Sequence, residues 1–196
     1  MNANCTSRRT RSGWIRRALL GTVASLGFVA TVAASDGRNA GSLLLYPEFD
    51  NRPGTVTLLS VTNVDTRESA VDVDVEFVYI GRFGMNGQNL NCGEFNRTET
   101  LTPGDTLTAL TFIHNPEHEQ GYVYVFAKNA ANQPMVYNWL TGNVMSVDGL
   151  SSFEYSVNPI AYTGIGNGEG TQADLDGDTY LDMNGCEYSA NPDAIL

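Results

Sequence analysis

Basic residues are scarce in this chain: 11 lysines and arginines stand against 22 aspartates and glutamates in 196 residues, a formal net charge of −11. A nucleic-acid-binding protein neutralises phosphates with clustered lysine and arginine, and an anionic membrane surface attracts the same residues. The composition therefore argues against both partners. It suits a protein that stays soluble outside the cell through its own negative charge.

Long apolar runs are also lacking, apart from one between Ala18 and Ala33 that glycine, serine and threonine dilute. This run is short for a membrane span. Five arginines and no acid precede it, and small residues follow it up to Ala34. This pattern is typical of an export signal peptide, residues 1–34, cleaved after Ala34 or, as second choice, after Ala33. An uncleaved anchor is the alternative. We expect a secreted, periplasmic or cell-surface protein with no stable membrane span after cleavage.

Cysteine is rare as well, with three in the chain, and Cys5 leaves with the signal peptide. Cys92 and Cys186 remain in a compartment that permits disulfides, but sequence alone does not set their distance, so bonded and free states stay open. Removing 34 of the 196 residues leaves 162, enough for one domain with a sizeable core. Removing five of the 11 basic residues and none of the 22 acidic ones leaves a net charge of −16.

Catalytic motifs are missing: the sequence has no G-x-S-x-G elbow and no phosphate-binding glycine loop after a strand. Its two histidines, His114 and His118, lie in the segment IHNPEHEQG. Two histidines and a carboxylate can hold zinc with an open position for water, as in a metal-dependent hydrolase. The spacing H-x-x-x-H presents one face only on a helix, however, and Pro116 lies between the pair. We therefore expect a surface turn between two strands and keep a His114/His118 metal site as the alternative.

Alternating hydrophobicity dominates the remainder of the chain. In AVDVDVEFVYI, residues 70–80, apolar side chains alternate with acidic ones, which is typical of a half-buried strand. Turn residues separate seven further segments rich in β-forming residues, and no amphipathic helix follows the signal peptide. These segments are residues 42–49, 54–64, 94–101, 105–113, 120–129, 134–147 and 151–162. The pattern predicts an all-β domain over residues 35–163, an antiparallel two-sheet sandwich of about eight strands, Ig-like or jelly-roll-like.

From residue 164 the composition becomes glycine-rich and acidic, and we expect residues 164–196 to form a tail that leaves the sandwich. Within it, four aspartates fall in nine residues. Calcium takes six to eight oxygen ligands, which an acidic loop supplies from alternate side chains and one backbone carbonyl. The alternative is a solvated acidic turn. We expect a structural calcium ion as the cofactor, bound by Asp174, Asp176, Asp178, Asp182 and the carbonyl of Tyr180.

The stretch DLDGDTYLD, which begins at Asp174, resembles the calcium loops of the EF-hand-like group, including dockerin, thrombospondin type 3 and FG-GAP-type repeats. It departs from that pattern at two positions. Thr179 stands where the group has glycine, and Gly185 stands where it has a bidentate glutamate. Glu187 could supply this carboxylate only in a distorted loop. The resemblance therefore implies weak binding, roughly millimolar as in other extracellular modules.

A wider resemblance covers residues 42–196. The runs SLLLYPEFDNRPG, CGEFNRTETLTPGDTLTALTFIHNP and QGYVYVFAKN resemble a group of uncharacterised exported bacterial proteins, which implies no activity. Those proteins continue past the equivalent of residue 196, which implies a short or truncated member.

The sequence favours an exported, non-catalytic structural or adhesion-type binding module, stabilised by calcium, whose partner is an extracellular protein or a carbohydrate. A carbohydrate-binding module is the first alternative and a metal-dependent hydrolase the second. The first requires an exposed, coplanar aromatic set, although such residues more often pack across strands. Its candidates are Tyr122, Tyr124, Tyr137, Trp139 and Tyr155.

Overall fold

A computed structural model describes residues 39–174 and 187–190. The described chain is almost entirely β, with one helical turn, and none of its helices is long and apolar enough to cross a membrane. The elements are β1 (Leu43–Asp50), β2 (Thr55–Asn63), β3 (Val73–Phe83), β4 (Asn89–Leu101), β5 (Thr106–Leu110), α1 (Thr111–His114), β6 (Gln120–Lys128), β7 (Leu140–Asp148), β8 (Phe153–Val157), β9 (Ile160–Gly164) and β10 (Tyr188–Ala190).

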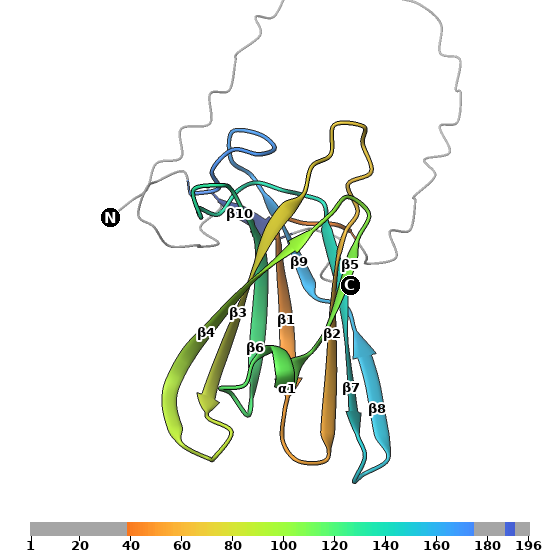
Figure 1. Ribbon diagram of the computed structural model, residues 1–196, viewed down its shortest axis with the longest axis vertical. Coiled ribbons are helices and arrows are strands. Elements are labelled where there is room, and N and C mark those ends of the chain that lie inside the picture. The colour runs from red at the N-terminus through yellow and green to blue at the C-terminus, as the bar shows by residue number, and fades with distance from the viewer. Residues whose placement is uncertain (1–38, 175–186, 191–196) are drawn as a thin grey trace, which may run out of the picture. The chain divides into compact units, whose positions relative to one another are not determined.

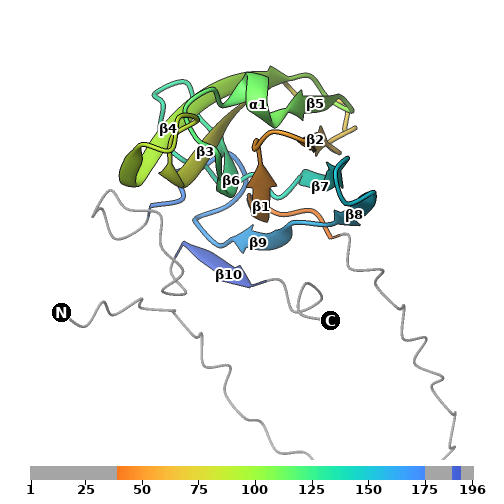
Figure 2. The same cartoon turned by 90° about the horizontal axis from the view of Figure 1, so that it is seen from below.

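The strands form two antiparallel sheets that pack face to face (Figures 1 and 2). A six-stranded sheet has the order β10-β9-β1-β6-β3-β4, and a four-stranded sheet has the order β5-β2-β7-β8. The short helix α1 lies on the side of the sandwich where the edge strands β4 and β5 come together (Figure 2). The predicted all-β, two-sheet antiparallel sandwich is confirmed.

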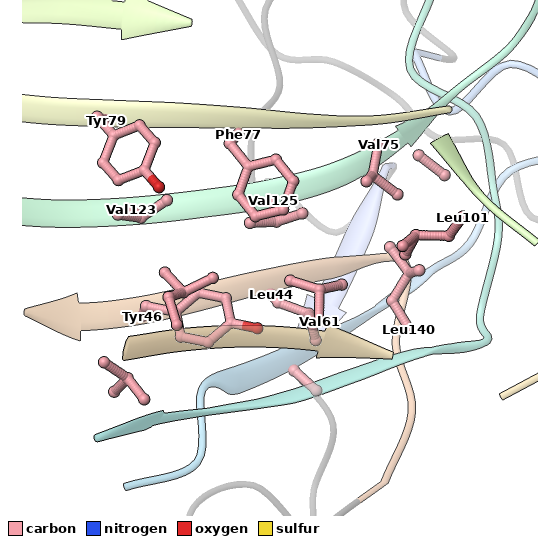
Figure 3. Packing of buried hydrophobic residues seen from close by; sticks show 14 of the residues in the cluster. Leu44, Tyr46, Val61, Val75, Phe77, Tyr79, Leu101, Val123, Val125 and Leu140 are labelled. Carbon is pink, nitrogen blue, oxygen red and sulfur yellow. The ribbon is translucent and has the colours of Figure 1, made fainter. Parts of the chain in front are cut away.

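The core lies between the two sheets and follows the period-two pattern of the strands. On β3, Val75, Phe77 and Tyr79 are buried, whereas Asp74 on the other side of the strand is exposed. Figure 3 shows these side chains in the core beside Val123 and Val125 of the neighbouring strand β6, with Val61 of β2 from the other sheet in the same cluster. Each fully buried aliphatic or phenyl side chain contributes about 1.5–3 kcal/mol through its removal from water.

One polar link crosses this core. The Tyr46 hydroxyl on β1 donates a hydrogen bond to the Ser60 carbonyl of β2 over 2.7 Å. Gly142 on β7 lies directly beside this link, and a Cβ there would overlap both the hydroxyl and the carbonyl oxygen. Glycine is required at this position because the tyrosine ring spans the full distance between the layers.

A second, smaller hydrophobic cluster covers the outer face of the six-stranded sheet. It joins Val78, Phe126 and Val136 to Ala173 and Tyr188. We expected residues 164–196 to leave the sandwich, but the described residues of this region pack on it. Ala173 is buried in the cluster, and β10 pairs with β9 as the edge strand of the sheet. Both described flanks of the acidic loop are therefore held on one sheet face.

Candidate binding surface

The predicted calcium ligands fall mostly outside the described residues. Asp174 is half-buried next to the buried Ala173, whereas Asp176, Asp178, Tyr180 and Asp182 lie in the part of the chain not described. Where the described chain resumes, Glu187 is fully buried beside Tyr188. The calcium site stays a prediction, with a buried carboxylate at its described C-terminal flank.

Of the two cysteines in the predicted mature chain, the structure describes only Cys92. Cys92 is exposed on β4, where its φ of +61° and that of Asn91, +53°, mark an irregular stretch of the edge strand. Cys186 lies outside the described residues. A disulfide between the two stays a prediction.

The expected surface turn around the histidines holds for Pro116 and Glu117, which are exposed, but both histidine side chains are buried. His114 Nδ1 lies 2.7 Å from the Tyr79 hydroxyl, and its Nε2 lies 3.4 Å from Glu99 Oε1. Both contacts suit a neutral ring with its proton on Nε2, so that Tyr79 donates to Nδ1 and Nε2–H points toward Glu99. Burial lowers the pKa of His114, and the nearby positive charge of Arg97 lowers it further.

His118 is fully enclosed, with 0% of its surface exposed. A Cβ at Gly81 would lie 2.6 Å from the His118 ring carbon Cδ2, so the imidazole takes the place of a side chain there. Gly81 pairs with Gly93 on one neighbouring strand and with Gly121 on the other, which opens a flat seat across β4, β3 and β6. Neither ring nitrogen has a hydrogen-bond partner of good geometry, although the Gly93 backbone lies close. Burial therefore lowers the pKa of His118.

A buried amide pins this segment to the turn after β1. The Asn51 side-chain nitrogen donates to the carbonyls of His118 over 2.9 Å and of Asn115 over 3.4 Å. The hydroxyl of Thr111 donates to Asn51 Oδ1 over 2.6 Å. His114, Asn115 and His118 are therefore part of the packed interior, which the proline and glutamates beside them in the sequence do not suggest.

Among the described residues, no group of three or more histidine, cysteine, aspartate or glutamate side chains is placed to hold a metal ion. His114 bonds to Tyr79 and His118 fills the glycine seat, so packing accounts for both. The geometry gives no support to the hydrolase alternative.

The five aromatic residues of the carbohydrate alternative do not share one face. Tyr137 is buried and Trp139 is half-buried. Tyr122 and Tyr124 lie on β6 of the six-stranded sheet, whereas Tyr155 lies on β8 of the four-stranded sheet. These side chains therefore do not form the coplanar platform that the carbohydrate alternative requires.

A different surface stands out: the outer face of the four-stranded sheet, which we call the uncharged face. Every second residue of β5, β2 and β7 is buried against the core, and the residues between them lie on this outer face. None of these outward-facing residues of the three described strands is charged. Glu154 on the edge strand β8 is its one acidic residue. The residues of the three strands are Val56, Leu58, Ser60, Thr62, Thr106, Thr108, Leu110, Thr141, Asn143, Met145 and Val147.

The uncharged face has an apolar half and a hydroxyl half. In the apolar half, Leu58 pairs with Leu110 and with Met145, and Val56 pairs with Val147. Exposed apolar side chains continue this half beyond the strands. They are Phe112 and Ile113 on α1, directly after β5, and Leu150, 84% exposed, in the β7–β8 turn against Gly54.

In the hydroxyl half, Thr62 pairs with Thr106 and with Thr141, and the first two hydroxyls are 2.8 Å apart. The outer face of the six-stranded sheet differs, because Asp74, Glu76 and Lys128 lie on it and Lys128 Nζ is 2.5 Å from Glu76 Oε2.

Sequence reasoning identified these strands but missed the surface that they share. The available signal was the lack of charge in TVTLLSVTN, TLTAL and LTGNVMSV, compared with the alternating acids of AVDVDVEFVYI. Only the strand order shows that the three uncharged segments are neighbours.

Comparison with known proteins assigns no family. The sequence matches no protein-family model, and a search among curated proteins finds no match. The crystal structure of Thermotoga maritima 1070 is similar with a TM-score of 0.42 and 11% sequence identity, over 68% of this chain and 99% of that chain. Similarity at this level assigns no function.

Proposed function

We propose that this chain is an exported, non-catalytic structural or adhesion-type binding module of the cell surface or extracellular space, and that it binds through the uncharged face. The observation that carries this proposal is the lack of charge across β5, β2 and β7 in a chain with a net charge of −11. The buried centres of protein interfaces are depleted in charged residues, and exposed apolar patches mark interaction sites.

The uncharged face is also suited to be covered. Four of its polar side chains already bond within the sheet: Thr62 to Thr106, and Asn143 to Ser156 and the Val157 carbonyl. A partner can therefore exclude water from them without leaving buried donors unpaired.

Binding at the uncharged face predicts different effects for two matched substitutions. Val56 and Tyr122 are 41% and 43% exposed on outer faces of opposite sheets, so each accepts a glutamate at similar cost to folding. We expect Val56→Glu to lower retention of residues 35–196 on washed cells of the source organism by about tenfold, and Tyr122→Glu to leave it unchanged. Retention is measured by sedimentation with fluorescently labelled protein, and thermal melts confirm that both variants fold.

Equal retention of the two variants would contradict binding at this face, as would a wild-type protein that stays in solution. Retention on chitin or cellulose that Val56→Glu leaves intact would favour the carbohydrate-binding alternative.

Calcium is the second part of the proposal. An ion in the acidic loop would join two flanks that already pack on one sheet face, through Ala173 and Tyr188. At 5 mM calcium and a millimolar dissociation constant, binding stabilises the fold by about 1 kcal/mol. This corresponds to a rise in Tm of about 2–4 °C.

We expect this rise with calcium but not with magnesium, and we expect Asp176→Ala combined with Asp178→Ala to abolish it. Glu68→Ala combined with Asp72→Ala removes the same charge from exposed positions and serves as control. Identical melting curves in calcium and in chelator would make the acidic loop a solvated turn.

A further inference from the structure

We infer that the partner of the uncharged face is a second copy of this chain. This inference rests on the proposed function and narrows it to homophilic contact between two uncharged faces. It is carried by the distribution of charge, the pattern of the face and its size.

Charge selects the surface through which two copies can meet. Without residues 1–34 each copy has 6 basic and 22 acidic residues, a net charge of −16, so two copies repel each other at long range. On the outer face of the six-stranded sheet, Asp74 and Glu94 would confront the same acids of the other copy, because the lysine of this face, Lys128, is already paired with Glu76. Among the described residues of the uncharged face, Glu154 at the edge is the only acid. A cationic partner would bind the acidic surface rather than the uncharged face. The better match for the uncharged face is a second uncharged face.

The pattern of the face is self-complementary. A two-fold axis through the apolar half places Val56, Leu58 and Met145 of one copy against the same residues of the other, as an isologous contact requires. Two sheets pack in this way with a small rotation between their strands and a spacing of about 10 Å. The hydroxyl half of each face then lies at the rim of the interface, which is the polar part of most protein interfaces.

The size of the face predicts a weak complex. β2 and β7 have nine residues each and are about 30 Å long, whereas β5 and β8 have five residues each and are about 17 Å long. At a strand spacing of about 4.8 Å they give a face of roughly 450 Å². A standard stable interface takes about 800 Å² from each partner. Phe112, Ile113 and Leu150 add apolar surface at one end of the face, but we expect a dissociation constant in the micromolar range or weaker.

Analytical ultracentrifugation of residues 35–196, the compact unit that contains all described elements, tests this inference. We expect a reversible monomer–dimer equilibrium between about 5 and 500 μM protein. The dimer should become several-fold tighter when NaCl is raised from 50 to 500 mM, because salt screens the repulsion between two acidic copies. A dimer held together by opposite charges would instead become weaker as the salt concentration rises.

Val56→Glu should weaken the dimer by about tenfold or more, because a two-fold contact brings the added carboxylate of one copy close to the same carboxylate of the other copy. Tyr122→Glu adds the same charge on the other sheet and should leave the dimer within about twofold. Melts at low concentration verify that both variants fold. A wild-type monomer throughout, or equal effects of the two substitutions, would overturn the inference. If a monomeric wild type is still retained on cells and Val56→Glu abolishes that retention, the proposed function stands and only homophilic contact fails.

Discussion

Replacing Gly81 by alanine is expected to destabilise the protein by about 3 kcal/mol. The added Cβ would lie 2.6 Å from His118 Cδ2, well inside van der Waals contact. The ring has little room to retreat, because its surface is fully enclosed and its backbone is bonded on both sides. The His118 carbonyl accepts from Asn51, and its N–H donates to Asn115 Oδ1 over 3.2 Å.

A double-mutant cycle separates this clash from the general cost of changing a glycine. His118→Ala alone leaves a cavity and is expected to cost about 2–3 kcal/mol. In the combined variant the new methyl group of Gly81→Ala occupies part of that cavity, so the double mutant should be about 2 kcal/mol more stable than the sum of the two losses. Gly149→Ala is the control, since a Cβ there meets no atom closer than 3.4 Å. Urea unfolding measures all four variants, and additive losses would show that His118 does not occupy the space above Gly81.

Lowering the pH from 7.5 to 5 is expected to lower the free energy of unfolding through the two buried histidines. Burial lowers the pKa of both His114 and His118 in the folded state. As the pH falls through about 6.5, the unfolded chain takes up these protons first, so stability falls with pH in this window. It is fully present above about 6.5 and is lost as the pH falls toward the folded pKa values. Each histidine contributes a slope of up to about 1.4 kcal/mol per pH unit.

The surroundings of the rings set their expected sensitivity. His114 faces Glu99, which favours its protonated form, and Arg97, which opposes it. Glu117 lies near His118, and neither nitrogen of its ring has a hydrogen-bond partner of good geometry. His118→Phe removes the titrating group and keeps a planar ring, and because this ring is larger in an enclosed seat we expect a cost of about 1–3 kcal/mol at pH 7.5. It should also flatten the pH dependence of urea unfolding.

The loss of stability caused by histidine protonation occurs at higher pH than the loss caused by protonation of the paired Asp65. The side-chain hydrogen bond from Arg67 lowers the pKa of Asp65 below its usual value of 3.8, so its contribution to stability is present above that value and lost only in stronger acid. A pH profile between 5 and 7.5 that His118→Phe leaves unchanged would show that this ring does not couple folding to pH.

The strands could be predicted because a half-buried strand must alternate apolar and polar side chains. The acidic alternation of residues 70–80 corresponds to β3 with the expected buried side. The predicted strand 151–162 is in fact two strands, β8 and β9, which belong to different sheets. Pro159 lies at the break, where its fixed φ and missing N–H end one ladder before the next begins.

The remaining features depend on contacts between distant segments. The three residues of β10 carry no strand signal of their own, since their conformation follows from pairing with β9. The burial of His118 could not be predicted because its seat combines Gly81, Gly93 and Gly121, which strand register alone brings together. The uncharged face likewise requires β5, β2 and β7 to be neighbours, an order that the chain sequence does not state.

The first and last described strands, β1 and β10, both belong to the six-stranded sheet, but they would resist a pulling force differently. β1, the first described strand, is hydrogen-bonded to β6 along most of its length and to β9 at its start. Tension applied at Leu43 must shear ladders on both sides of an interior strand. Tension applied at Ala190 meets one edge strand of three residues, Tyr188–Ala190. A load between Leu43 and Ala190 would therefore detach β10 first and leave the rest of the sandwich folded.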